Sequence, residues 1–315
     1  MASINSKSRP PKIIKKTVIF TDYNCNNNCI FCIDAEKRGI KGKTTGEIRR
    51  EMVESRKRGS TYLELIGGEP TARGDMLELV AFASSLGFKT ITMTTNGRVF
   101  SYPDYVRAMV KAGLTNVVFS IHGHTAELHD KLTRAEGSFA QLTKGLDNFR
   151  KLGFKNIGSN TTIVKQNYEV LPAIGRFLSA QGIKNAEFIF VDPNYGAAKL
   201  NFKELVPRIS EIAPYVRECL DHGRANKSDH WHIRYVPLCY FPDYLDQISE
   251  IDEVKKFKSE HLAPDFENYA VESSRASVGR IKPDKCRACR LFDQCEGIWR
   301  EYVRQYGDEE LKPIF

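Results

Sequence analysis

Apolar, β-branched segments and helix-like segments alternate through the first two hundred residues of this 315-residue chain. Strand-like runs lie at residues 17–21, 61–66, 89–94, 116–121, 156–164 and 186–191, and each run but the last is followed by a helix-like stretch. Such alternation predicts an α/β fold, because helical connections make consecutive strands parallel in one covered sheet. Ligands of such folds bind at the carboxyl ends of the strands, so functional residues are expected there.

Three cysteines follow the first strand-like run: Cys25, Cys29 and Cys32, spaced C-x3-C-x2-C. A loop with these gaps can place three thiolates on three corners of a [4Fe-4S] cluster, which leaves the fourth iron open. A structural zinc site would need a fourth nearby cysteine or histidine, and the first histidine is His122. Three residues cannot pair off as disulfides, and no secretory leader is expected. The loop therefore predicts an iron–sulfur centre with one open site.

A second motif, Gly67-Gly68-Glu69-Pro70, ends the second strand-like run. Its glycines would let a ligand approach the backbone closely, and the carboxylate could accept hydrogen bonds from an ammonium group. An ordinary strand-to-helix turn is the simpler interpretation. Small polar side chains, Thr95, Asn96 and Ser120, stand at the ends of later strands. They suit a ribose or a carboxylate, although capping of loops or helices would also explain them.

These motifs, with the aromatic Phe31 before the third cysteine, resemble the signature of the radical S-adenosylmethionine (SAM) enzymes. The resemblance implies a partial (β/α)6 TIM-type barrel in which the open iron of a [4Fe-4S] cluster chelates SAM. Reductive cleavage of SAM would yield a 5′-deoxyadenosyl radical that abstracts hydrogen from a substrate carbon. The cofactor-binding residues implied are Phe31, Gly67, Gly68, Glu69, Pro70, Thr95, Asn96, Ser120 and Asn160. Gly68 and Glu69 would hold the amino group of SAM, Ser120 its ribose or carboxylate, and Asn160 its ribose.

A second cysteine group, Cys286, Cys289 and Cys295, is spaced C-x2-C-x5-C near the carboxyl end and predicts a second metal site. The spacing resembles part of the SPASM and twitch extensions of radical SAM enzymes. The full SPASM pattern has a further cysteine where this chain has Trp299, which implies one auxiliary [4Fe-4S] cluster, with Cys239 as its fourth ligand. Such a cluster would relay electrons. A closed zinc site with four cysteines is the alternative.

The chain divides into a basic N-terminal segment (1–16), a radical SAM core barrel (17–195) and an auxiliary-cluster domain (196–315), with turn residues 192–196 at the second boundary. In the third part, 203–223 and 299–306 are predicted helices and 231–239 is a short strand. The polar stretch 258–285 is predicted to be a linker or a lid. Cys219 lies in the first of these helices, and its expected role is packing.

Several other residues are candidates for chemistry by their position alone. Asp192, Tyr195 and Tyr240 are candidates for a general base. His122 is expected either to face the substrate or to be solvated. Arg134 is expected either to pair with a carboxylate or phosphate or to be a surface charge.

The formal net charge of +8 would favour a nucleic acid, a phosphorylated metabolite, an acidic peptide or an acidic electron donor, such as flavodoxin or ferredoxin. The basic residues are scattered and no nucleic-acid-binding module is recognisable, so a nucleic acid partner is not expected. No apolar run approaches the ~18 residues that span a membrane, which predicts a soluble protein. Seven of the eight cysteines are assigned to clusters that need free thiolates, which fits a reducing cytoplasm.

The patterns leave three hypotheses for function. The SPASM-like tail favours an enzyme that oxidises or modifies a peptide, working with a separate peptide-recognition protein. A single auxiliary cluster favours a small-molecule enzyme that rearranges or decarboxylates a sugar, nucleoside or cofactor precursor. A non-catalytic iron–sulfur or zinc-binding protein is the third, and the intact motifs argue against it. The sequence therefore predicts a radical SAM enzyme, an oxidoreductase or a lyase, that acts on a peptide or small metabolite.

Overall fold

The computed structural model describes residues 13–228 and 230–315, so most of the predicted N-terminal segment (1–16) lies outside the described residues. Within the described ranges, the main sheet has nine strands in the order β7-β6-β5-β4-β3-β2-β1-β8-β9. All neighbouring pairs are parallel except β8 with β9. The strands are β1 (Ile14–Phe20), β2 (Tyr62–Ile66), β3 (Thr90–Thr95), β4 (Asn116–Ser120), β5 (Ile157–Ile163), β6 (Asn185–Phe190), β7 (His230–Arg234), β8 (Phe257–Leu262) and β9 (Glu267–Asn268).

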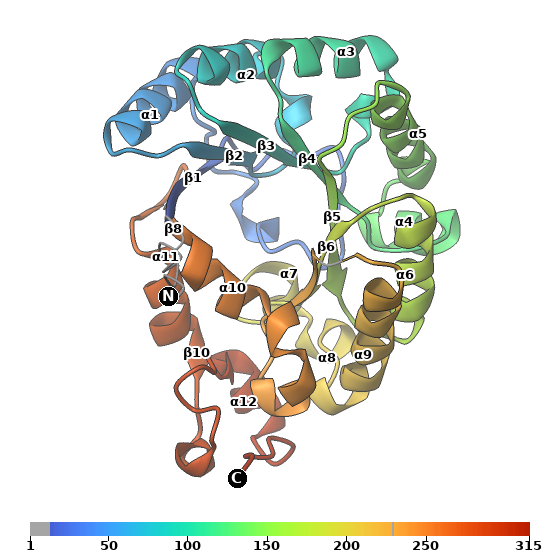
Figure 1. Cartoon of the computed structure of the whole chain (residues 1–315), viewed down its shortest axis with the longest axis vertical. Helices are drawn as coiled ribbons and strands as arrows, with labels where there is room; N and C mark the ends of the chain where they lie inside the picture. The colour runs from blue at the N-terminus through green and yellow to red at the C-terminus, as the bar shows by residue number, and fades with distance from the viewer. Residues whose placement is uncertain (1–12, 229) are drawn as a thin grey trace, which may run out of the picture.

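The predicted α/β fold with a parallel sheet is confirmed, and the strands curve into an incomplete ring with helices outside it (Figure 1). The helices are α1 (Thr45–Lys57), α2 (Met76–Ser85), α3 (Pro103–Ala112), α4 (Ala126–Thr133), α5 (Ser138–Lys151), α6 (Leu171–Ala180), α7 (Gly196–Leu200), α8 (Phe202–Leu205), α9 (Ile209–Ala225), α10 (Ser249–Lys256), α11 (Val271–Ser274) and α12 (Arg300–Tyr306). Local sequence defines their ends. Thr44 and Glu47 form a capping box at α1, and Gly113, in a left-handed conformation, ends α3.

The two faces of the sheet differ in polarity. On β4, Val117 and Phe119 are buried beneath the helices, and the Phe119 ring lies 5.9 Å from that of Phe149 on α5. The inner face is more polar, because Lys16 on β1 pairs with Glu64 on β2 at 2.6 Å and Glu64 accepts a hydrogen bond from Thr94. The main core therefore lies between the sheet and its helices, and charged side chains line part of the ring's interior.

The prediction of a linker or lid over residues 258–285 was wrong for its first part, which contains β8. This strand pairs with β1 from Ile14↔Phe257 to Ile19↔Leu262. Polar residues dominate β8, and Glu260 accepts a hydrogen bond from Thr17, so the strand lacks the apolar pattern that marks its neighbours. Since β7 and β8 both come after residue 195, the sheet continues past the predicted boundary there. The division into core and auxiliary domain stays a prediction.

The ring is open between β7 and β8, as expected for a partial barrel. Among residues 13–228 and 230–315, β7 forms no ladder with β8, and an isolated bridge joins Ile233 on β7 to Ile248, the residue just before α10. Helix α10 lies in this gap (Figure 1). Side chains of α10 therefore take the place that backbone pairing has elsewhere in the ring.

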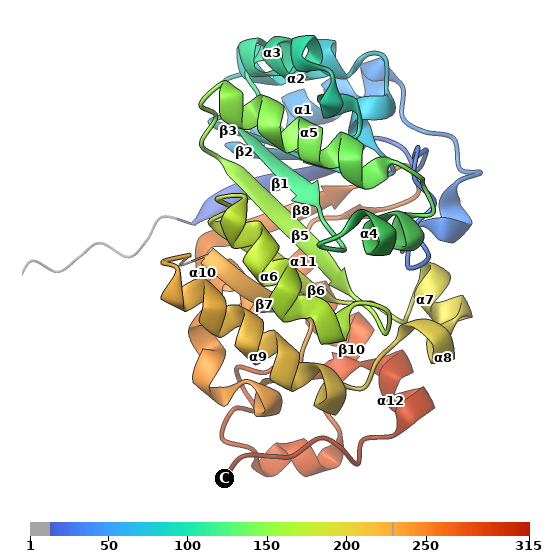
Figure 2. The ribbon, with the colours of Figure 1, turned by 90° about the vertical axis from the view of Figure 1, so that its right-hand side faces the viewer.

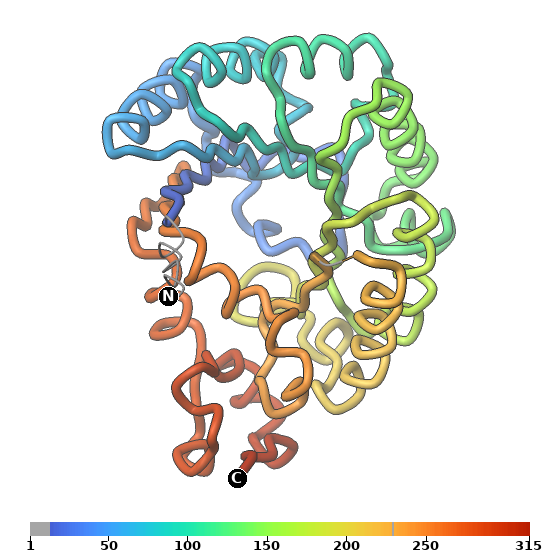
Figure 3. The backbone as a smooth tube through the Cα atoms, viewed as in Figure 1, coloured from blue at the N-terminus to red at the C-terminus, as the bar shows by residue number. Residues whose placement is uncertain are grey.

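The C-terminal region lies beside the barrel, at the open side of the ring (Figure 1, Figure 2). It holds the antiparallel ribbon of β10 (Arg280–Ile281) and β11 (Ile298–Trp299), then α12, which ends at Gly307 as predicted. The predicted helix over 203–223 is broken near Pro207 into α8 and α9. Figure 3 shows the loop between β1 and α1 crossing the opening that the strands surround. In the described part of the chain, no helix is both long and apolar enough to cross a membrane.

Candidate functional site

The loop that carries Cys25, Cys29 and Cys32 is fixed over the carboxyl ends of the strands, here called the mouth of the barrel. The backbone N–H of Asn28 donates to Thr133 O, and that of Ile30 donates to Leu132 O, both at 2.9 Å. On its other side, Ala197 at the start of α7 donates to the Cys32 carbonyl at 3.0 Å. The close approach of α7 needs Gly196, because a Cβ there would overlap the carbonyl oxygen of Ile33. Helices α4 and α7 therefore set the path of the loop.

The three thiols are partly exposed and unpaired by disulfides. Burial raises the pKa of all three, that of Cys29 to about 12, and each negative charge would also disfavour the others. Because burial disfavours each ionised thiolate, a cationic centre would stabilise all three, which makes these cysteines a fitting donor set for an iron–sulfur cluster. Cys25 Sγ also accepts from the backbone N–H of Asn27 at 3.4 Å and from Asn96 Nδ2 at 3.8 Å.

The Gly67-Gly68-Glu69-Pro70 motif packs directly against the cysteine loop. The backbone N–H of Gly68 donates to Asp22 O at 2.8 Å, and that of Glu69 donates to Asn24 O at 2.7 Å. Gly68 is required for this approach, because a Cβ at Gly68 would overlap the carbonyl oxygen of Asn24. The structure thus brings together two motifs that lie about one βα unit apart in the sequence.

The Glu69 side chain points into the protein, where it is only 1% exposed. Its Oε1 accepts hydrogen bonds from the hydroxyls of Thr71 (2.6 Å) and Thr95 (2.7 Å), and its Oε2 accepts from the backbone N–H of Asn96 (2.6 Å). Burial raises the pKa of Glu69, against the effect of these bonds. The carboxylate thus braces the end of β3 against the motif, and its implied contact with SAM stays a prediction.

Two arginines that the sequence patterns did not single out also hold the cysteine loop. Arg98 donates to the carbonyl of Asn26 and to Asn27 Oδ1, the latter at 3.0 Å, and Arg38 donates to Asn27 O at 2.8 Å. Their only signal in the sequence is proximity, since Arg98 follows Asn96-Gly97 and Arg38 follows the loop by six residues. The positive charge of Arg38 acts on all three thiols and lowers their pKa values, against the effect of burial.

Ser120, the last residue of β4, pairs in register with Asn160 in the middle of β5. Both are partly exposed, and both lie on the strand face opposite the helix-packed residues Phe119 and Thr161. Ser120 therefore stands at the inner rim of the mouth, Asn160 lies beside it on the inner face of the sheet, and the contacts of both residues with SAM stay predictions.

His122 meets neither of its two expectations. It is buried beneath the cysteine loop, with its ring 4.7 Å from that of Phe31, and its Nδ1 accepts from the backbone N–H of Thr162 at 3.2 Å. Burial lowers the pKa of His122 to about 3, so the ring is neutral at physiological pH. It supports Phe31 and joins β5 to the loop after β4. Arg134 is exposed in the turn after α4, as expected for a surface charge.

The three general-base candidates separate in space. Asp192 follows β6 at the mouth, where its Oδ1 accepts from the backbone N–H of Asn194 at 2.8 Å. Tyr195 lies on the rim and is 52% exposed. The Tyr240 hydroxyl instead donates to the carbonyl of Glu310 at 2.6 Å, which engages it within the C-terminal region.

Asp192 provides a prediction for pH dependence. Burial raises its pKa from 3.8 to about 6, so the folded protein holds a proton there that the unfolded chain releases, and stability falls as the pH rises from about 4 to about 6. Asp192→Asn should remove this loss. The free energy of unfolding of the variant minus that of the parent should therefore be about 1–3 kcal/mol larger at pH 8 than at pH 4. Anaerobic urea unfolding of both proteins at the two pH values measures the difference. If variant and parent differed in free energy of unfolding by the same amount at both pH values, Asp192 would not bind the additional proton in the folded state.

The four remaining candidate ligands line one cavity in the C-terminal region. Cys239, Cys286, Cys289 and Cys295 share its wall with apolar side chains such as Leu238, Ile281, Leu291, Phe292 and Leu311. The cavity holds about 400 Å³ of empty space, part of it open to solvent. Burial raises the pKa of Cys239 to about 11, and the three other thiols add to the effect. Backbone N–H groups of Gly297 and Ile314 donate to the sulfurs of Cys295 (3.3 Å) and Cys289 (3.4 Å).

These four thiols do not meet at a single point. Among residues 13–228 and 230–315, no three acidic, histidine or cysteine side chains converge closely enough to hold one metal ion. Cys219 stands apart from both cysteine groups. It is fully buried on α9 against Gly175 and burial raises its pKa, as expected for a packing residue.

Several known proteins are similar to this chain in sequence or in fold. The sequence profile of the Radical SAM superfamily matches residues 19–178. A probable GTP 3′,8-cyclase of Saccharolobus solfataricus is 28% identical over 215 residues, which cover 68% of this chain and 68% of that enzyme. An AdoMet-dependent heme synthase of Methanosarcina barkeri is 32% identical over 46% of this chain and 41% of that enzyme. Among solved structures, Streptococcus suis SuiB bound to its precursor peptide SuiA aligns with a TM-score of 0.68 and 17% identity, over 93% of this chain and 73% of SuiB.

Proposed function

Because the chain belongs to the radical SAM superfamily, whose enzymes use a [4Fe-4S] cluster and SAM, we propose that Cys25, Cys29 and Cys32 hold that cluster. When bound, the cluster and SAM supply a 5′-deoxyadenosyl radical that abstracts hydrogen from a substrate carbon. The single observation that supports this assignment best is the contact between the cysteine loop and the glycine motif, which only a residue without a side chain permits at Gly68.

Different residues at the mouth would fix the cysteine loop, bind SAM and hold the SAM-binding residues in place. Arg38 and Arg98 fix the cysteine loop and offset the negative charge of its thiolates. The backbone of Gly67 and Gly68, with Ser120 and Asn160 across the mouth, would bind SAM. Glu69 would act beneath them by holding Thr95 and Asn96 in place.

We also propose that Cys239, Cys286, Cys289 and Cys295 hold an auxiliary [4Fe-4S] cluster of the SPASM or twitch type, within the region 196–315. The four cysteines line one cavity, and most of the other side chains in its wall are apolar. Four protein ligands would leave no open iron, which suits electron relay better than substrate binding. The free thiolates of both sites require a reducing compartment such as the cytoplasm, and flavodoxin or ferredoxin would supply the electrons.

Metal analysis tests both assignments. The anaerobically reconstituted protein is expected to contain about eight irons per chain, and Cys239→Ala about four, because the auxiliary cluster loses a ligand. Cys219→Ala is the matched control and should retain about eight, since that thiol only packs in the core. About four irons and one zinc in the parent would instead support a closed zinc site.

For the substrate, we propose first a peptide that is oxidised or otherwise modified. The likeness to SuiB extends over the C-terminal region as well as the barrel, and SuiB was solved with its precursor peptide. A separate peptide-recognition protein would then be a partner.

The second candidate is a small polar metabolite, which the charged interior of the ring favours. Lys16 and Glu64 face that interior with side chains 19% and 16% exposed, and Glu187 on β6 is 32% exposed beside Arg234 on β7. Such groups suit a small charged molecule better than an apolar peptide side chain. The GTP 3′,8-cyclase of Saccharolobus solfataricus gives a defined compound, GTP, to test.

One assay separates the two candidates. The reduced enzyme is incubated with SAM and with GTP, with the low-mass fraction or with the peptide fraction of a cell extract. The fraction that raises 5′-deoxyadenosine release above the substrate-free rate contains the substrate. Stimulation by the peptide fraction alone would reject the small-metabolite candidate, and stimulation by low-mass compounds alone would reject the peptide.

A further inference from the structure

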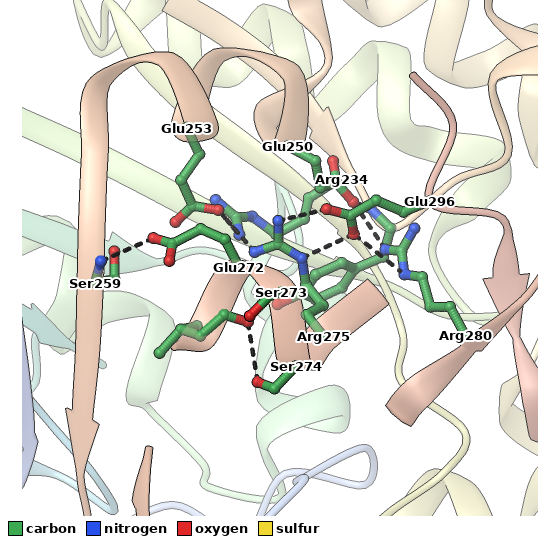
Figure 4. Close-up of polar contacts among 12 residues, drawn as sticks. Arg234, Glu250, Glu253, Ser259, Glu272, Ser273, Ser274, Arg275, Arg280 and Glu296 are labelled. Carbon is green, nitrogen blue, oxygen red and sulfur yellow. Dashed lines mark hydrogen bonds and ion pairs between the residues drawn. The ribbon is translucent and has the colours of Figure 1, made fainter. Parts of the chain in front are cut away.

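A continuous chain of ion pairs connects the barrel with the segment that carries Cys295 (Figure 4). Arg234 on β7 pairs with Glu187 on β6 at 2.7 Å and with Glu253 on α10 at 3.1 Å. Arg275, in the turn after α11, pairs with the same Glu253 at 2.8 Å and with Glu296 at 2.7 Å. Glu296 directly follows Cys295, so the chain ends beside one of the four thiols of the C-terminal cavity.

Arg275 is the member of this chain that joins the two regions. Its Nη1 donates to Glu253, while its Nε and Nη2 both donate to Glu296, at 2.9 and 2.7 Å. Figure 4 shows the guanidinium between the two carboxylates. The side chains of Arg275, Glu253 and Glu296 are 8%, 13% and 14% exposed. Ion pairs at this depth are weakly screened, and removing one partner leaves buried charge uncompensated.

A second link runs parallel to the first. Arg280 on β10 is 2% exposed, and it donates to Glu250 Oε1 at 2.8 Å and to Gly297 O at 3.3 Å. Glu250 and Glu253 lie one helical turn apart on α10, the helix that fills the gap between β7 and β8. Burial raises the pKa of Glu253, but the positive charges of Arg234 and Arg275 outweigh this effect and lower the pKa to about 2. The ion pairs of Glu253 therefore remain charged at physiological pH. Helix α10 thus holds the C-terminal segment where the sheet is open.

We propose that Arg275 is a positioning residue for the auxiliary cluster. It fixes the Cys295 segment against the barrel, and its positive charge raises the reduction potential of that cluster. The electrostatic part rests on the proposed function, because it requires a cluster in the four-cysteine cavity. The mechanical part, that Arg275 fixes the Cys295 segment against the barrel, does not require a bound cluster.

Two variants separate the mechanical and electrostatic parts. Arg275→Met keeps the length of the side chain and removes its charge and hydrogen bonds. Arg275→Lys keeps the charge but cannot bind both carboxylates as a planar fork. Arg287→Met is the matched control for the exchange measurement, because the exposed Arg287 pairs with the exposed Asp284, at 2.8 Å.

The experiment uses the reconstituted full-length protein under anaerobic conditions. Amide hydrogen exchange over residues 280–299 should become about tenfold faster or more in R275M, since at least one buried charged pair is lost. It should be intermediate in R275K and unchanged in R287M. A redox titration followed by electron paramagnetic resonance should place the auxiliary potential lower in R275M and near the parent value in R275K.

Each outcome decides one part. Parent-like exchange in R275M would overturn the positioning role, and an unchanged potential in R275M, or an equal shift in R275K, would overturn the electrostatic role. If the parent contains only about four irons, the auxiliary cluster itself fails, and the exchange rates still test whether Arg275 fixes the segment. Arg275→Gln serves both measurements if R275M does not fold.

Discussion

Replacing Cys29 by alanine is expected to abolish the reductive release of 5′-deoxyadenosine from SAM. Cys29 lies in the middle of the cysteine loop, between two backbone hydrogen bonds that fix its neighbours Asn28 and Ile30 against α4. Alanine at this position would leave two thiolates for the cluster that we propose is held by three. The measurement is 5′-deoxyadenosine released per chain, by chromatography, under oxygen-free conditions with a strong reductant.

The same preparations should show where the loss arises. Iron content should fall by about four per chain in Cys29→Ala, while the C-terminal cysteines keep theirs. Cys219→Ala controls for the loss of a thiol as such, because Cys219 contacts Gly175 in the core and neither cysteine group. Persistent release of 5′-deoxyadenosine by Cys29→Ala would rule out the assigned cluster site.

The barrel could be predicted because most of its first six strands carry a buried apolar face. In β4, for example, Val117 and Phe119 alternate with less buried residues, which gives the period of two that marks a strand. The polar sequence of β8 has no such face toward helices. Its place in the sheet depends on pairing with β1, more than two hundred residues earlier, and on contacts such as that of Thr17 with Glu260. Long-range pairing of this kind leaves no local pattern.

The parts of the candidate site that short sequence motifs encode could be predicted. The cysteine loop and the glycine motif each follow a strand, and parallel strands bring their carboxyl ends to one edge of the sheet. His122 was misjudged because its burial depends on Phe31, which lies far from it in the sequence. The ion pairs of Arg275 were not predicted either, since Glu253 and Glu296 lie about twenty residues away on opposite sides. Isolated charges in a polar stretch give no sign of their partners.

Replacing Gly68 by alanine is expected to displace the cysteine loop and to reduce 5′-deoxyadenosine release by about 100-fold or more, because small misplacements of reacting groups have effects of this size. The new Cβ would overlap the carbonyl oxygen of Asn24, which lies just before Cys25. Since both atoms belong to the frame of the site, neither can move as a flexible side chain would. We therefore also expect a loss of stability of about 3 kcal/mol.

Gly74→Ala is the matched control for Gly68→Ala, because a Cβ at Gly74 would meet no atom within 4 Å. Its activity and stability should equal those of the parent protein. The premise of the Gly68→Ala prediction is that a rigid contact between the glycine motif and the cysteine loop is needed to hold SAM beside the cluster. Normal 5′-deoxyadenosine release by Gly68→Ala, with normal unfolding in urea, would show that the contact is dispensable. Loss of release with the fold intact and the iron content retained would instead show that Gly68 acts on SAM placement and not on cluster binding.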